Sequence, residues 1–115
     1  MKLAIIGSRD FNDYDLLYNT VARHFNINNI SLIISGGARG ADKLGAKLAI
    51  QCKIPLKEHI PEWDIFGKSA GFKRNELIIE DSDVVLACWD GVSKGTRHSL
   101  GIAKRLKKPT FIIYF

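Results

Sequence analysis

Short apolar segments alternate with segments of helical periodicity along the whole chain, and this alternation is the feature that most restricts the fold. The segments 3–6, 31–34, 84–88 and 110–115 are apolar and rich in β-branched residues, which is the composition of strands buried on both faces of a sheet. Because helical segments separate them, the strands have to pair in parallel through right-handed crossovers. The sequence therefore predicts an α/β fold: one three-layer domain over residues 1–115, with a five-stranded, mainly parallel open sheet.

Periodicity and capping residues place the individual elements. Asp13 is expected to cap a helix that ends near 26–29, and apolar positions recur at helical spacing between 41 and 52. The segment 54–59 carries a proline and two charged residues, which is typical of an edge strand. The strands are placed at 2–6, 31–34, 54–59, 83–89 and 109–115. Two further helices are expected around 75–80 and 95–107, and the segment 61–71 is expected to be irregular.

Three glycine-containing turns follow strand-like segments and lead into helical ones, at 6–10, 35–42 and 90–96. Glycine lets the backbone approach a ligand closely, and the unpaired N–H groups of a first helical turn attract anions. Open α/β sheets bind ligands beyond the carboxyl ends of their strands, so we expect the three turns to meet there as phosphate-binding loops. The candidate ligand-binding residues in these turns are Gly7, Ser8, Arg9, Asp10, Gly36, Gly37, Arg39, Gly40, Asp42, Gly95 and Thr96.

The net charge of +5 fits either nucleic acid or a small anionic ligand beside a solvated surface. The cations between 104 and 108 crowd the end of a predicted helix, where they complement the negative end of the helix dipole. Arg9, Arg39 and Arg97 instead lie in or beside the glycine turns. An anionic ligand explains these arginines better than the fold does.

Other compositional features restrict the class of protein. With 46% hydrophobic and 25% charged residues, the chain has the composition of an ordinary soluble protein. The apolar stretch at 3–6 is too short for a signal sequence or a membrane span, so we expect a cytoplasmic protein without a membrane partner. Cys52 and Cys88 lie in apolar patterns, and the three histidines are far apart. We therefore expect buried free thiols, no metal site and no cofactor.

Five short motifs occur in order along the chain: Gly7-Ser8-Arg9-Asp10, the segment 36–42, Trp63-Asp64 with Gly67 and Ala70-Gly71, Arg74-Asn75, and Gly95-Thr96. Together they resemble the YspA-like group of the SLOG superfamily, and the match runs nearly end to end. The resemblance implies a Rossmann-like fold and a ligand such as a nucleotide or an ADP-ribose derivative. It also implies that Arg74, with Asn75 beside it, binds the ligand.

The same resemblance extends to the LOG proteins, which hydrolyse the N-glycosidic bond of a nucleoside monophosphate. They use an Arg matched here by Arg74 and a Glu shortly after a Gly-Thr pair. In this chain Gly95-Thr96 is followed by Arg97-His98-Ser99, so the carboxylate that would stabilise an oxocarbenium-like transition state is missing. The catalytic residues are therefore unknown. Carboxylates at other positions, namely Asp10, Asp42, Asp64, Glu76 and Asp90, remain candidates.

The expected function is that of a single SLOG-like nucleotide-binding domain whose partner is a nucleotide or nucleotide-derived small molecule. Two alternatives stay open. One is a LOG-like nucleotide N-glycosidic-bond hydrolase or transferase. The other, less favoured, is binding of single-stranded nucleic acid, which the charge and the kinship of the superfamily with DprA suggest, but which usually relies on aromatic stacking.

The sequence also leaves several local questions open. A homo-oligomer is one alternative for the assembly state. Asp10 either pairs with Arg9 or Arg39 or holds a ribose hydroxyl, and Thr96 is either a helix cap or a ligand contact. Trp63 and Trp89 either stack on a base or pack against the protein.

Overall fold

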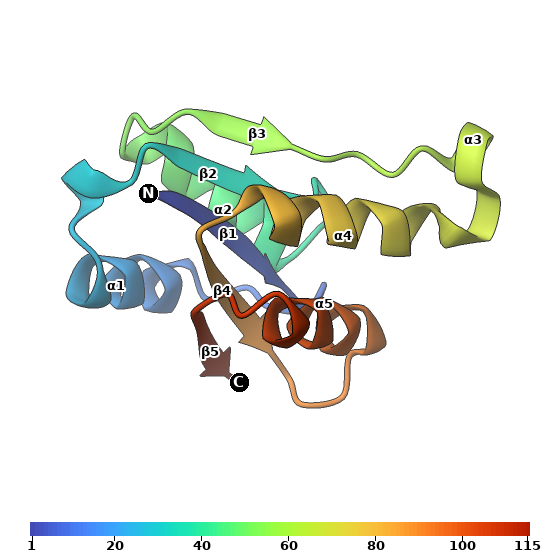
Figure 1. Ribbon diagram of the computed structural model, residues 1–115. Helices are drawn as coiled ribbons and strands as arrows, with labels where there is room; N and C mark the ends of the chain where they lie inside the picture. Colours follow the sequence, from blue (N-terminus) through green and yellow to red (C-terminus); the bar gives the residue numbers. More distant parts are fainter.

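A computed structural model describes residues 1–115 and shows a five-stranded sheet in the order β3-β2-β1-β4-β5 (Figure 1). Every neighbouring pair is parallel, so the predicted α/β fold with a parallel open sheet is confirmed. The strands are β1 (Lys2–Gly7), β2 (Leu32–Ser35), β3 (Leu56–Glu58), β4 (Val84–Trp89) and β5 (Thr110–Tyr114). The α-helices are α1 (Tyr14–His24), α2 (Ala41–Gln51), α3 (Trp63–Phe66), α4 (Ala70–Asp81) and α5 (Lys94–Arg105), with short 3-10 helices at Ile27–Asn29 and Gly67–Ser69.

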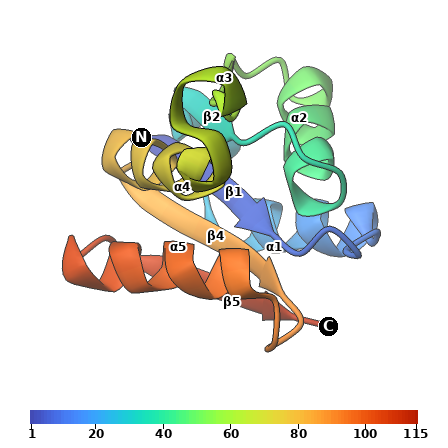
Figure 2. The ribbon, with the colours of Figure 1, turned by 90° about the vertical axis from the view of Figure 1, so that its right-hand side faces the viewer.

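The central strand β1 is buried on both faces, because its side chains alternate between two apolar layers. Leu3 and Ile5 pack with α1 and α2, whereas Ala4 and Ile6 pack with α4 and α5. Figure 2 shows the sheet between these two helix pairs. Each buried aliphatic side chain of this size contributes roughly 1.5–3 kcal/mol to folding. The continuous apolar run of β1, without polar alternation, is thus what a middle layer requires.

Two helix positions show how local sequence fits this packing. The Asp13 carboxylate accepts a hydrogen bond from the Leu16 amide at 3.0 Å, which confirms it as the cap of α1. Gly45 lies where α2 crosses the sheet, and a Cβ at this position would stand 2.9 Å from Ile5 Cγ2. A side chain there would push α2 away from β1.

The chain between β3 and α4 differs from the sequence prediction. The edge strand is shorter than the predicted 54–59 and begins at Leu56, after Pro55, which has no N–H to donate. The segment predicted to be irregular contains α3 and the start of α4. Helix α3 ends where Gly67 takes a positive φ of 56°, and α4 begins with the buried Ala70. The turn at Gly67 interrupts the helical periodicity, so the sequence prediction misses α3 and the first turn of α4, whereas the rest of α4 contains the predicted helix around 75–80.

The strand order creates one opening at the carboxyl edge of the sheet. From β1 the chain moves outward through β2 to β3, then crosses back through α4 to β4 on the other side of β1. The order therefore reverses between β1 and β4, and the loops after these two strands diverge there. None of the helices is both long and apolar enough to span a bilayer.

Candidate ligand-binding site

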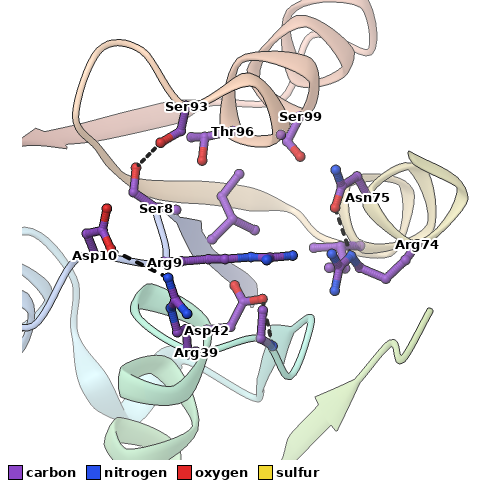
Figure 3. Close-up of a pocket in the computed structure, with 15 residues that line it drawn as sticks. Ser8, Arg9, Asp10, Arg39, Asp42, Arg74, Asn75, Ser93, Thr96 and Ser99 are labelled. Atoms are coloured by element: carbon purple, nitrogen blue, oxygen red, sulfur yellow. Dashed lines mark hydrogen bonds and ion pairs between the residues drawn. The ribbon is translucent and has the colours of Figure 1, made fainter. Parts of the chain in front are cut away.

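A cavity of about 380 Å³ lies at this reversal point, and four segments of the chain line it. These are the loop after β1, the loop between β2 and α2, one face of α4, and the first turn and a half of α5 (Figure 3). Its size falls in the range of about 300–1,000 Å³ that is usual for small-molecule sites. The lining residues are Ile6, Gly7, Ser8, Arg9, Asp10, Ala38, Arg39, Asp42, Arg74, Asn75, Ile78, Ser93, Gly95, Thr96 and Ser99.

Two glycines allow the first two loops to touch. A Cβ at Gly7 would lie 2.2 Å from the Cys88 carbonyl oxygen, so only glycine fits between β1 and β4 here. Gly40 has a φ of 81°, and a Cβ there would lie 2.4 Å from the Ser8 carbonyl oxygen. That oxygen accepts a hydrogen bond from the Ala41 amide at 3.2 Å, which fixes the start of α2 against the β1 loop. Gly40 therefore shapes the site from outside the cavity lining.

Asp42 is a buried acid in the middle of the site. Its Oδ2 accepts a hydrogen bond from the Ala38 amide at 3.2 Å and so holds the second glycine loop. Burial raises the pKa of Asp42 from 3.8 to about 6, although the Ala38 hydrogen bond and the Arg74 charge oppose this shift. The carboxylate is therefore ionised at neutral pH at a cost to the fold.

Arg74 reaches from α4 to the second glycine loop. Its Nη1 donates to the Gly36 carbonyl oxygen at 2.8 Å, and its Nε donates to Asn75 Oδ1 at 2.9 Å. Burial lowers the pKa of Arg74, the Asp42 charge raises it, and the Arg9 charge lowers it again. Arg74 stays protonated over the physiological range, so the site contains two mutually repelling guanidinium groups.

Arg9 and Arg39 both lie in glycine-containing turns, but their side chains have different surroundings. Arg39 is mainly exposed and lies 3.8 Å from Asp10 Oδ1, so Arg39 rather than Arg9 is the arginine beside Asp10, whereas a contact of Asp10 with a ribose hydroxyl stays a prediction. Arg9 makes no hydrogen bond or ion pair within the chain, and Figure 3 shows its side chain extended across the cavity toward Arg74. Arg9 is thus the cation of the site that lacks a protein partner.

The third turn is organised by Asp90. Its Oδ1 accepts from the amides of Val92 and Ser93 at 2.9 and 2.8 Å, and its Oδ2 accepts from the Ser93 hydroxyl at 2.7 Å. These bonds lower the pKa of Asp90 to about 2. The Ser93 hydroxyl lies 2.9 Å from Ser8 Oγ, so the chain of hydroxyls ties the third turn to the first.

The start of α5 presents unused donors to the cavity. Ser93 is the N-cap, so Thr96 is not, and the amides of Lys94, Gly95 and Thr96 donate to no acceptor in the chain. The side chains of Thr96 and Ser99 line the cavity from residues that are otherwise buried, and their hydroxyls make no hydrogen bond within the chain. Figure 3 shows both reaching toward the cavity. This wall is equipped to hold an anion.

A second cavity of about 360 Å³ adjoins the first, and Arg9, Ala38, Arg74, Asn75 and Gly95 line both. Its other walls are the backbone of the second glycine loop and apolar side chains from the α3 and α4 region. The residues that line only this second cavity are Gly36, Gly37, Ile60, Pro61, Trp63, Lys68, Gly71 and Phe72.

The structure brings most of the predicted site residues to one place, whereas what they bind stays a prediction. Gly36 and Gly37 line the second cavity rather than the first. Ser93 and Ser99 line the first cavity and were not predicted. Ser99 had a detectable signal, since it lies three residues after Thr96 and hence on the same face of α5. The structure contains no group of three or more His, Cys, Asp or Glu side chains placed to hold a metal ion.

A parallel sheet covered on both faces, with its site at the reversal of strand order, defines the class of Rossmann-like α/β proteins. The sequence profile described as the YspA, cpYpsA-related SLOG family matches residues 1–66. The chain belongs to this family, as its motifs indicated. It is also 31% identical to the Gene 61 protein of Mycobacterium phage D29, over 94% of this chain and 92% of that protein.

Two solved structures have a similar fold. DNA processing protein A from Helicobacter pylori, described for its single-stranded DNA binding mode, has a TM-score of 0.75 and 26% identity over 97% of this chain. DNA processing protein A from Streptococcus pneumoniae has a TM-score of 0.76 over 96% of this chain, and its 19% identity supports the fold alone. This chain spans 64% and 49% of those two chains, respectively.

Proposed function

We propose that this domain binds a nucleotide or nucleotide-derived small molecule, with a phosphate group in the cavity between β1 and β4. The observation that carries the proposal is the convergence of unpartnered donors. Arg9, the cavity-lining residues Gly95 and Thr96 with their free amides, and the hydroxyls of Thr96 and Ser99 border one cavity, and none of these donors has an acceptor in the chain. Unpaired polar groups around a cavity are costly unless water or a ligand satisfies them.

A phosphate suits this set better than a carboxylate or a neutral ligand. The start of α5 supplies the positive end of a helix dipole, and a guanidinium supplies parallel N–H donors that match phosphate oxygens. Arg9 and Arg74 repel each other across the site, and a bound dianion removes this repulsion. Asp42 lies in the same cavity and offsets part of the positive charge of these two arginines.

Substitution of Arg9 tests this proposal most directly, because its side chain makes no hydrogen bond or ion pair within the chain and acts on Asp42 only through its charge. We expect Arg9→Gln to weaken the binding of AMP and ADP-ribose by about 10- to 150-fold, the equivalent of one charge-assisted hydrogen bond of roughly 1.5–3 kcal/mol. Isothermal titration calorimetry measures the affinity, and urea unfolding checks that stability is unchanged. Arg105→Gln is the matched control, since this exposed arginine lies at the other end of α5.

Two results would count against a phosphate pocket. One is the absence of binding for every phosphate compound tested, including inorganic phosphate. The other is an equal loss in Arg9→Gln and Arg105→Gln, which would indicate that only the net charge matters. The double variant Arg39→Ala/Arg74→Ala is a second test. Because Arg74 also donates a hydrogen bond to the Gly36 carbonyl oxygen, urea unfolding has to show that this variant is folded.

Single-stranded nucleic acid is the second candidate. It is favoured by the likeness to the Helicobacter pylori protein, which binds single-stranded DNA, and by the net charge of +5. In that case an oligonucleotide should bind more tightly than AMP, and its affinity should fall steeply with salt because counterions are released. Fluorescence anisotropy at two salt concentrations, with AMP as competitor, separates the two candidates.

Hydrolysis of a nucleotide is less favoured by the geometry. Of the three residues after Thr96, Ser99 lines the cavity, so a hydroxyl stands near the position where the LOG resemblance implies a carboxylate. The carboxylates that line the cavity are Asp10, which faces Arg39, and Asp42, which holds the Ala38 amide. Chromatography of AMP incubated with the protein tests the reaction, since turnover releases free adenine.

A further inference from the structure

The second cavity has walls unlike those of the first. Trp63, Ile60 and Phe72 contribute apolar surfaces, and Gly36 and Gly37 line the same cavity without side chains. The first cavity is instead bordered by hydroxyls, amides, arginines and the carboxylates of Asp10 and Asp42. The two adjoining cavities therefore offer different chemistry to the two ends of one ligand.

Trp63 differs from the other tryptophan in what holds it. The indole of Trp89 donates to the Ser93 carbonyl oxygen at 3.2 Å, faces Tyr114 with 6.1 Å between ring centroids, and has the Arg97 guanidinium 5.7 Å from its own centroid. Trp63 has no hydrogen bond and no aromatic partner, and 56% of it is exposed. Its nearest glycine neighbour is Gly71, where a Cβ would lie 3.8 Å from the indole. Contacts within the chain explain the position of the Trp89 indole, whereas the Trp63 indole has no such partner.

The glycines of this cavity keep it open. Gly37 has a φ of 74°, and a Cβ there would lie 2.7 Å from Ile60 Cδ1. A side chain at this position would displace Ile60, which lines the same cavity. A flat aromatic ring that enters beside Trp63 thus meets backbone and apolar side chains, the surroundings in which base stacking is strong.

The boundary between the two cavities carries groups suited to a sugar. Asn75 lines both, and because its Oδ1 accepts from Arg74 Nε, its amide nitrogen is left without a partner in the chain. Arg9 and Arg74 border both cavities as well. A ligand with a phosphate in the first cavity and an aromatic ring in the second would therefore place its connecting sugar beside a free amide donor.

We propose that the second cavity binds the base of the nucleotide, stacked on Trp63, while the phosphate occupies the first cavity. This inference rests on the proposed function and narrows its ligand class to phosphorylated nucleosides and their derivatives. Sugar phosphates and inorganic phosphate, which lack a base, fill only the first cavity and bind more weakly.

The test compares AMP with ribose 5-phosphate by isothermal titration calorimetry on the full chain. Stacking of one base on an aromatic side chain corresponds to an affinity change of about 5- to 150-fold. We expect AMP to bind more tightly than ribose 5-phosphate by a factor in this range. Trp63→Ala should remove that advantage without changing the affinity for ribose 5-phosphate, and Trp63→Phe should retain most of it. Ile65→Ala is the matched control, since Ile65 is an exposed apolar residue of α3 outside both cavities.

The possible results separate this inference from the proposed function. Equal affinities for AMP and ribose 5-phosphate, or an equal loss of both in Trp63→Ala, overturn the base site and leave the phosphate site standing. Failure of AMP, ribose 5-phosphate and inorganic phosphate to bind overturns the proposed function, and the base site with it. Unfolding of Trp63→Ala would show that the indole is structural and would also overturn the inference, a result that urea unfolding detects.

Discussion

The unaltered protein is expected to lose stability between acid and neutral pH because Asp42 ionises. Replacing Asp42 by Asn should remove this loss. The Asp42 carboxyl has a pKa raised from 3.8 to about 6, mainly by burial. A folded-state pKa above the unfolded one means that the fold prefers the neutral acid. The contribution of Asp42 to stability is thus highest below about pH 4, falls as the pH rises to about 6, and is constant above that.

The size of this effect follows from the two pKa values. One pKa unit is worth about 1.4 kcal/mol, so the ionisation of Asp42 costs on the order of 3 kcal/mol at pH 7. Arg74 and Arg9 face the carboxylate and limit the cost, whereas Glu58 adds to it. Asn keeps an oxygen that accepts from the Ala38 amide but carries no charge, so the stability of Asp42→Asn should not follow this transition.

Urea unfolding followed by circular dichroism, repeated between pH 4 and pH 7, measures the effect. The free-energy difference between Asp42→Asn and the unaltered protein should shift by roughly 3 kcal/mol in favour of the variant over this range. Other titrating groups cancel in the difference. Asp10→Asn, a substitution at a side chain that is 82% exposed, should show no such shift. A pH-independent difference for Asp42→Asn would refute the assigned cost of burial.

Two further substitutions test the loops. Gly40→Ala should destabilise the domain by roughly 1–3 kcal/mol more than Gly91→Ala in urea unfolding, because both glycines have a positive φ but only a Cβ at Gly40 meets the Ser8 carbonyl; equal losses would contradict the close approach of the two loops. Asp90→Asn should lower the thermal midpoint at pH 6, and because the pKa of Asp90 is held at about 2, the deficit should shrink as the pH falls from about 4 toward 2. A deficit that stays constant down to pH 2 would indicate that the charge of Asp90 does not organise the third turn.

The fold and the position of the site follow closely from the sequence. Continuous apolar runs such as Leu3–Ile6 predict strands covered on both faces, and the capping role of Asp13 was readable because a cap acts within one helical turn. The glycine turns were readable for a similar reason, since steric limits on the backbone act locally. The segment around Gly67 was misread because α3 and the 3-10 helix Gly67–Ser69, which precede α4, are too short for a periodic signal.

Which side chains meet in the site was decided by the tertiary structure. Arg9 and Arg39 are equivalent in their motifs, yet Arg39 turns outward to Asp10 while Arg9 crosses the cavity. The sequence also does not distinguish Trp63 from Trp89. The tertiary structure does, because Trp63 on α3 lines the second cavity whereas Trp89 donates to the carbonyl oxygen of Ser93 in the third turn. The physical reason is that burial patterns and turns depend on near neighbours in sequence, and the amino-acid sequence by itself determines them. The direction of a side chain, and the partner it finds, depend on packing between β1, α4 and α5, whose order in space only the folded chain establishes.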